Sequence, residues 1–559
     1  MFTSKKQSLF DVPTKKVATS DNSNPFIQAG LKTSAETVSG NGALKYSTTG
    51  NPFIDQFGKI GSYKAARSFA EISQDCETLW AKNKTTSVLF TFYLRMISRQ
   101  VQFFDGSKTE TPQKGAEMKH EGIMRMIWLH LKDETLFWNN IQLFIAAGSW
   151  KDIIVMLQYD LIYNGWNDRK LNWSKFSNLI LSGLENDKTR ELLKKYLPQI
   201  KAKSACKTVE SQADTLIAKW ICSQIFGNKE GDAKTYKAYR LLKSSGTAHQ
   251  WQQLISKRQY DKIDFASIHG RALKLLTRSK WLKNSGLEQS YTKWITKPET
   301  EAKWTGFVHE LFDKLPKRLL QLESYKAETI NKQFLTAVNK VKSGESTQTE
   351  LIVVRDTSGS MGSQAPGSSM TCYDIGKALA LYFSQFLTGK FSNSWIEFNS
   401  NAKMHQWIGN SPIQCWYNDP SSCVGSTNFQ SVISLLCQIK QQGVPESEFP
   451  KGILCISDSE FNPTQLGRTN VDQALRTLRS VGFSDEYVDN FVIVLWNLQN
   501  NYYGKGSGSK FETYGDVKNV FYFSGYSAST VSFLTQKIKT ASELFDAAMD
   551  QEVLNMIQI

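Results

Sequence analysis

The turn at residues 356–360, Asp-Thr-Ser-Gly-Ser, carries a carboxylate and two hydroxyls that could bind a divalent metal. The apolar run Leu-Ile-Val-Val at 351–354 directly precedes the turn and predicts a buried strand. Open α/β sheets bind ligands at the carboxyl ends of such strands. Mg²⁺ prefers oxygen ligands and keeps part of its water shell, so Asp356, Ser358 and Ser360 would suit it. In isolation, however, a serine-rich turn with an aspartate often only satisfies backbone groups.

Two segments further along the chain could complete this site. Thr427 lies just before a helical pattern that begins at Phe429. The apolar run 452–456 ends in Ser457-Asp458, which places a second carboxylate at a strand end. The sequence therefore predicts that three loops meet at one edge of a sheet and bind a divalent metal, with Mg²⁺ as the expected ion. The predicted ligands are Asp356, Ser358, Ser360, Thr427 and Asp458.

These five residues, in this order, resemble the metal-ion-dependent adhesion site of von Willebrand factor A domains, and residues 346–559 are similar to such a domain. The resemblance implies that the two serines and the threonine ligate the metal. It implies that the aspartates hold the metal directly or through water. It also implies that one coordination position stays open for an acidic group of a protein partner.

The other elements expected in 346–559 agree with a doubly wound, Rossmann-like α/β sheet. One helix is predicted from Tyr373 to Leu387 and a closing helix from Ala528 to Ala548. The further predicted strands lie at 395–398, 403–407, 490–496 and 519–523. Strands that alternate with helices in this way predict a parallel sheet.

The metal-binding turn does not fit the enzyme classes that use a similar one. Phosphotransferases of the haloacid dehalogenase class need a second carboxylate two residues after the first, where this chain has Ser358. The chain has no Gly-x-Ser-x-Gly elbow. None of its Gly-Lys pairs is followed by Ser or Thr, as a P-loop requires. We therefore expect no catalytic activity.

The basic residues are concentrated ahead of this part of the chain. Residues 346–559 hold 14 Lys and Arg against 19 Asp and Glu. Because the whole chain has a net charge of +15, the first 345 residues carry +20. Such a field concentrates polyanions, of which nucleic acid is the usual one. The alternative is that the lysines only solvate helix surfaces.

The basic stretch at residues 251–283 also contains the aromatic residues Trp251, Tyr260 and Trp281, which could stack on bases. Arg271, Lys274 and Arg278 should form one stripe of a helix that starts near residue 265, because they recur at three- and four-residue spacing. A solvated helix face with its aromatic residues in the core is the alternative. The residues predicted to contact RNA are Lys257, Arg258, Arg271, Lys274, Arg278, Lys280 and Lys283.

Between residue 51 and about residue 320, apolar residues recur at helical spacing. Helices are predicted at 63–78, 86–100, 115–131, 134–147, 151–163, 173–183 and 209–226. Successive amphipathic helices suggest an array of HEAT-like repeats, which would offer an extended concave surface. We therefore expect a multidomain chain. Its parts are a flexible arm rich in small polar residues (1–50), a helical HEAT-like domain (51–345) and the von Willebrand factor A-like domain (346–559).

Segments 92–99 (Phe-Tyr-Leu-Arg-Met-Ile-Ser-Arg) and 147–154 (Ala-Gly-Ser-Trp-Lys-Asp-Ile-Ile) resemble the TROVE module of the Ro ribonucleoproteins. That family implies a HEAT-repeat ring closed by a von Willebrand factor A domain. It also implies that the ring binds small noncoding RNA on its basic outer surface and single-stranded RNA ends in its central hole. The chain departs from the Ro pattern after Arg99, where Gln-Val-Gln-Phe-Phe replaces a Gly-Lys-Gly-like stretch. The resemblance is closer still to a group of TROVE-like proteins from plants and large viruses. It rests on segments 194–198, 260–265 and 457–461.

The sequence thus predicts a noncatalytic RNA-binding scaffold with a Mg²⁺-dependent domain for protein interaction or ring closure. The alternative is a protein-assembly module, for instance a viral structural component, that has no role with RNA. We expect no membrane contact and no small-molecule substrate. The eight cysteines without Cys-x-x-Cys pairs and the lack of an apolar N-terminal leader predict an intracellular, cytoplasmic protein. A virion or an infected cell is the alternative setting.

Overall fold

The computed structural model describes residues 36–38, 43–46, 48–60, 67–227, 232–245, 250–342, 350–386, 391–464, 468–499, 517–526 and 540–559. The described residues fall into two compact units. The helical unit contains residues 67–259 and 549–559, and the sheet unit contains residues 36–60 and 260–548. Each unit is described by itself.

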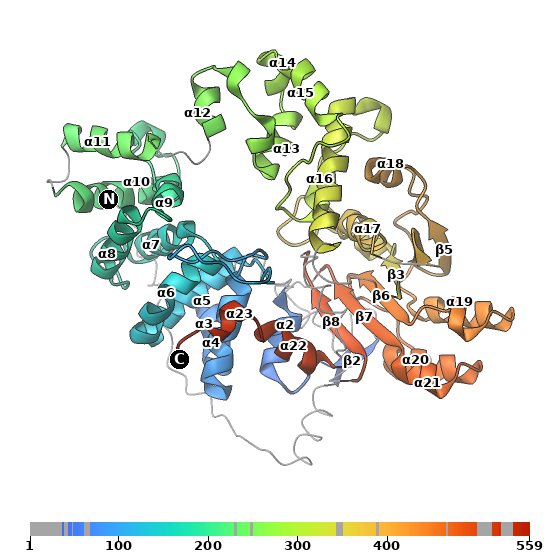
Figure 1. The fold of residues 1–559 in the computed structure, drawn as a ribbon. Coiled ribbons are helices and arrows are strands. Elements are labelled where there is room, and N and C mark those ends of the chain that lie inside the picture. The colour runs from blue at the N-terminus through green and yellow to red at the C-terminus, as the bar shows by residue number, and fades with distance from the viewer. Residues whose placement is uncertain are drawn as a thin grey trace. The chain divides into compact units, whose positions relative to one another are not determined.

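The helical unit is built from short helices, and helices that follow one another in the chain pack antiparallel (Figure 1). Its helices are α3 (Phe69–Lys82), α4 (Lys84–Arg95), α5 (Lys119–Lys132), α6 (Glu134–Ala147), α7 (Trp150–Asn164), α8 (Trp173–Glu185), α9 (Arg190–Tyr196), α10 (Val209–Phe226), α11 (Ala233–Ser244), α12 (Gln250–Ser256) and α23 (Glu552–Asn555). Helices α6 and α10 have the predicted bounds. Helix α4 ends at Arg95, earlier than predicted, because the chain after Met96 is extended and the segment before α5 binds the last carbonyls of α4.

Buried ion pairs hold these helices together. The Glu121 carboxylate of α5 accepts from Arg67 at 3.1 Å and from Arg125 at 2.9 Å, and all three side chains are fully buried. Arg95 of α4 binds Asp152 of α7 at 2.7 Å. Buried charges are tolerated only when paired in this way, so removing one partner of such a pair is costly.

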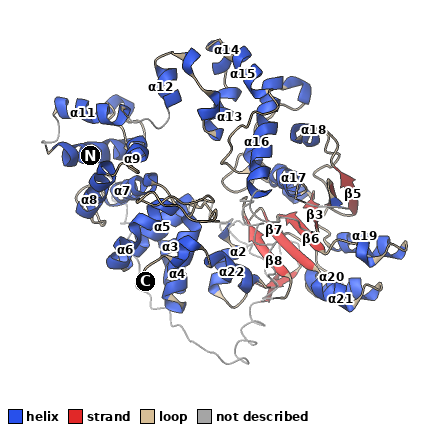
Figure 2. Cartoon of the chain, in the orientation of Figure 1, coloured by secondary structure: helices blue, strands red, loops and turns tan. Residues whose placement is uncertain are grey.

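The sheet unit contains a two-stranded hairpin and a six-stranded sheet, shown in red in Figure 2. The hairpin strands are β1 (Glu36–Val38) and β2 (Leu44–Tyr46). The sheet strands are β3 (Leu351–Asp356), β4 (Ser394–Phe398), β5 (Ala402–Gln406), β6 (Gly452–Ser457), β7 (Val492–Asn497) and β8 (Val520–Ser524). The helices are α2 (Pro52–Gly58), α13 (Gly270–Arg278), α14 (Trp281–Asn284), α15 (Glu288–Ile295), α16 (Ser324–Lys342), α17 (Cys372–Phe383), α18 (Pro412–Tyr417), α19 (Gln430–Gln441), α20 (Asn470–Ser480), α21 (Asp485–Asn490) and α22 (Ala541–Met549).

The strand order of the large sheet is β5-β4-β3-β6-β7-β8, so the direction of winding reverses between β3 and β6. Right-handed crossovers that run in opposite directions place their helices on opposite faces of a sheet. Figure 1 accordingly shows α17 on one side of the strands and α19, α20 and α21 on the other. All strands are parallel except β5, which pairs antiparallel with β4. The predicted parallel sheet is therefore present, and only the strand at this edge departs from it, because residues 399–401 form a link too short for a crossover.

The predicted order, a helical part followed by an α/β part, is confirmed. Helices α13–α16 group with the sheet unit, and residues 549–559 group with the helical unit. The domain boundaries at residues 50 and 345 therefore stay predictions. Residues 1–35 of the predicted arm and residues 528–539 of the predicted closing helix lie outside the described residues. None of the helices that the structure describes is long and apolar enough to cross a membrane.

Candidate metal centre

Backbone hydrogen bonds bring the three predicted loops together. The Gly359 amide donates to the Gly425 carbonyl at 3.0 Å, and the Val424 amide donates to the Thr357 carbonyl at 2.9 Å. The Asn462 amide, just beyond the end of β6, donates to the Thr427 carbonyl at 2.9 Å. Because β3 and β6 are parallel neighbours, their carboxyl ends meet at this edge. The segments that carry the five predicted ligands are therefore adjacent.

The predicted side chains differ in exposure and in the contacts they make. Asp356, Ser358, Thr427 and Asp458 are buried, and Ser360 is half-buried. The Ser358 and Ser360 hydroxyls lie 3.0 Å apart. The Asp356 carboxylate accepts from the Ser358 amide at 2.8 Å. The Thr427 carbonyl accepts from the Asn462 amide, whereas the bonds to the turn after β3 are made by Val424 and Gly425.

The two carboxylates are in an unfavourable environment for charge. Burial, followed by the negative charge of Asp458, raises the pKa of Asp356 to about 7. A divalent cation between these loops would neutralise both carboxylates, since an opposite charge favours the ionised form. The donors are carboxylate and hydroxyl oxygens, which fit a hard cation such as Mg²⁺. Among the described residues no group of three or more His, Cys, Asp and Glu is placed to hold a metal ion, so a metal here would depend on the hydroxyls beside the two aspartates.

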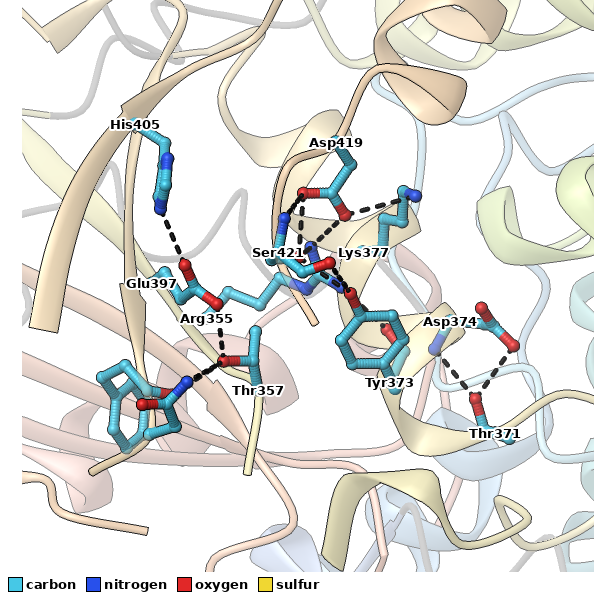
Figure 3. A network of polar contacts seen from close by, with 12 residues as sticks. Arg355, Thr357, Thr371, Tyr373, Asp374, Lys377, Glu397, His405, Asp419 and Ser421 are labelled. Carbon is cyan, nitrogen blue, oxygen red and sulfur yellow. Dashed lines mark hydrogen bonds and ion pairs between the residues drawn. The ribbon is translucent and has the colours of Figure 1, made fainter. Parts of the chain in front are cut away.

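Arg355, the residue before Asp356, braces the loop that leads to Thr427 (Figure 3). Its guanidinium binds Asp419 at 2.7 Å, and both side chains are fully buried. Lys377 of α17 binds the same carboxylate at 3.2 Å. Burial alone would raise the pKa of Asp419, but the charges of Arg355 and Lys377 outweigh it and lower the pKa to about 2.

A second set of bonds holds the turn to β4 and β5. The Thr357 hydroxyl donates to the Glu397 carboxylate at 3.0 Å and accepts from the side-chain amide of Asn399 at 3.1 Å. The other oxygen of Glu397 lies 2.7 Å from His405 Nε2, as Figure 3 shows. The turn is therefore fixed on both sides, which predisposes its hydroxyls for a ligand without reorganisation.

The predicted RNA stripe is present on α13, but its cations already have partners within the chain. Arg271 binds Glu310 through two nitrogens at 2.8 and 3.0 Å, and Arg278 donates to the Leu311 carbonyl at 2.9 Å. The Lys274 ammonium lies 5.8 Å from the ring of Trp304, and burial followed by the charge of Arg278 lowers its pKa to about 8. The helix begins at Gly270, later than the predicted start near Phe265.

The four other predicted cations are exposed: Lys257, Arg258, Lys280 and Lys283. The first two belong to the helical unit and the last two to the sheet unit. Trp251 is buried, and Tyr260 packs edge-on against Trp281 with ring centroids 6.1 Å apart. RNA contact by the seven residues stays a prediction.

Sequence reasoning missed the residues that support the site. Ser457 donates to Asp356 at 2.5 Å, and its only sequence signal is its place directly before Asp458. Lys377 lies in the predicted helix at 373–387 and Asp419 lies in a loop, and neither position carries a sequence signal for an ion pair. Their role depends on the long-range contact with Arg355 and could be found only in three dimensions.

The fold and this site define an α/β part whose sheet edge is lined by carboxylates and hydroxyls, preceded in the chain by a helical part. Residues 350–556 match a family described as a domain of unknown function, DUF7788. The chain is also similar to an uncharacterized protein of Acanthamoeba polyphaga mimivirus. The two are 22% identical over 497 residues, which cover 82% of this chain and 78% of the relative. All five predicted metal ligands lie within the matched region.

Proposed function

We propose that this chain is a noncatalytic RNA-binding scaffold, in which the basic, helical N-terminal part binds RNA. The separation of charge carries the proposal, since the first 345 residues hold a net charge of +20 and the rest hold −5. A basic surface of this kind binds phosphates through counterion release without needing a defined sequence. The successive short helices of the helical unit support a HEAT-like array.

In this proposal the sheet unit carries a von Willebrand factor A-like domain with a Mg²⁺-dependent adhesion site. Two observations support it: the winding of the sheet reverses between β3 and β6, and the loops with the five ligands meet beside that point. The net negative charge of residues 346–559 disfavours RNA at the metal. An acidic group of a protein partner is the expected ligand of the open metal position.

A protein-assembly module without an RNA role is the second candidate. The similarity to a viral protein leaves a virus-related setting open, although the name of that relative states no activity. Both candidates use the metal site in the same way. They differ in whether the basic N-terminal part, residues 1–345, binds RNA or protein.

Purification of the full chain at low ionic strength separates the two candidates. The protein is expected to retain RNA, seen as excess ultraviolet absorbance of nucleic acid that ribonuclease and a high-salt wash remove. Treatment with deoxyribonuclease alone serves as the control. A preparation kept at low salt whose spectrum is unchanged by ribonuclease would contradict the scaffold and favour the assembly module.

A further inference from the structure

A cavity of about 600 Å³ in the helical unit lies between α5, α7, α9 and the start of α10. We call it the lysine cavity, because four lysines and two tyrosines line it: Lys119, Lys151, Lys195, Lys201, Tyr159 and Tyr196. Its volume is within the range of small-ligand sites in proteins. None of these residues is among the cations predicted from sequence to contact RNA.

The chain balances the positive charge of the lysine cavity only in part. Within the part of the chain that the structure describes, none of the four lysines forms an ion pair. Two acidic residues, Glu210 and Asp214, also line the cavity, which leaves an excess of two positive charges. Lys119 is exposed, but desolvation of its ammonium and then the charge of Lys151 lower its pKa, while the charge of Asp152 acts in the opposite direction. An anion near this lysine pair would relieve their repulsion.

The lysine cavity differs in this respect from the stripe on α13. There Arg271 is paired with Glu310 and Arg278 with a backbone carbonyl. Cations that already have partners gain less from an external phosphate, because the existing bonds must break first. The lysine cavity is therefore the better anion site among these basic clusters.

The two tyrosines give the lysine cavity ring surfaces beside the ammonium groups. The Tyr159 hydroxyl lies 2.9 Å from His120 Nδ1, and His120 Nε2 lies 3.0 Å from the Arg67 carbonyl. A carbonyl can only accept, so Nε2 donates and Nδ1 accepts from the tyrosine, which fixes the ring of Tyr159. Tyr196 is half-buried, with the Lys195 ammonium 4.8 Å from its ring. Aromatic rings next to cations are the usual surface for a base and its phosphate.

We infer that the lysine cavity binds a nucleoside phosphate, with the phosphate on Lys119 and Lys151 and the base against the ring of Tyr196. The ligand is either a free mononucleotide or one nucleotide of single-stranded RNA. In the RNA form the inference rests on the proposed function and adds a defined contact point. Inorganic phosphate alone would bind the lysines but would not contact the ring of Tyr196.

The test measures binding of fluorescein-labelled oligouridine to the full chain by polarisation, with UMP, AMP and inorganic phosphate as competitors. The variant K119A/K151A is expected to bind the oligonucleotide about tenfold more weakly. Its log-affinity against log-salt slope should be smaller by about 2, roughly 1 for each phosphate-binding lysine. The matched control K234A/K237A removes two exposed lysines of α11 and should change affinity little. Tyr196→Leu should weaken oligouridine and UMP but leave competition by phosphate unchanged.

The outcomes separate the inference from the proposed function. If the wild type binds RNA and K119A/K151A matches K234A/K237A, the lysine cavity is not the site, although the scaffold stands. If UMP and AMP bind through the cavity residues while RNA does not bind, the inference holds in its mononucleotide form and the scaffold fails. Binding of neither RNA nor mononucleotide by the wild type overturns both.

Discussion

Replacing Arg355 by methionine is expected to lower the free energy of unfolding by about 3–5 kcal/mol, the cost of breaking a buried ion pair. The methionine keeps the apolar stem but leaves the fully buried Asp419 carboxylate with Lys377 as its only cationic partner among the described residues. Urea titration followed by circular dichroism measures the change. Arg479→Met is the matched control, because Arg479 is 42% exposed and its ion pairs with Asp485 and Asp489 are at the surface. That variant should lose less than about 1 kcal/mol.

The pH dependence of this loss identifies its cause. In the wild type the pKa of Asp419 is about 2, below its ordinary value of 3.8. A depressed pKa contributes stability that is present above about pH 4 and is lost as the pH falls toward 2. The gap between the wild type and R355M should therefore shrink by about 2 kcal/mol across that window. A gap that is independent of pH, or a loss as small as that of Arg479→Met, would show that the ion pair does not brace the loop that leads to Thr427.

Asp356→Asn is expected to abolish the stabilisation of the protein by Mg²⁺. Saturating metal at about a hundred times its dissociation constant adds about 2.7 kcal/mol to the wild type, which corresponds to a rise in Tm of about 5 °C. Without metal, the variant should be at least as stable as the wild type. The reason is that a neutral amide removes the repulsion between two buried carboxylates while it can still accept from the Ser358 amide.

Differential scanning calorimetry with Mg²⁺ and with EDTA gives both results. Ser358→Ala should also lose the Mg²⁺ response, since its hydroxyl is a predicted ligand. Asp485→Asn, which neutralises an exposed carboxylate in the same unit, should keep the full response. A Mg²⁺-dependent rise in Tm that survives in Asp356→Asn would refute the metal site.

The features that sequence predicted best are those that depend on local pattern. The turn at 356–360 follows an apolar run, and Thr427 and Asp458 lie at the ends of adjacent elements, so their convergence follows from the order of strands and helices. The stripe on α13 was also predicted correctly as a stripe, because helical spacing alone determines it.

The features that sequence missed depend on contacts between distant segments. The partner of Arg271 is Glu310, and the partner of Arg355 is Asp419. Neither pair has a sequence signal, so the sequence could not show that Arg271 and Arg355 have carboxylate partners within the chain. The lysine cavity was missed for the same reason, since its cations come from three separate segments and meet only in the folded helical unit.

The most direct test of the scaffold is a filter-binding titration of the full chain with single-stranded and structured RNA at increasing salt. For such a scaffold we expect micromolar or tighter affinity at low salt. We also expect a log-affinity against log-salt slope of about −3 or steeper, which corresponds to roughly four or more neutralised phosphates. No retention of either RNA at about 50 mM salt, or a slope near zero, would contradict it.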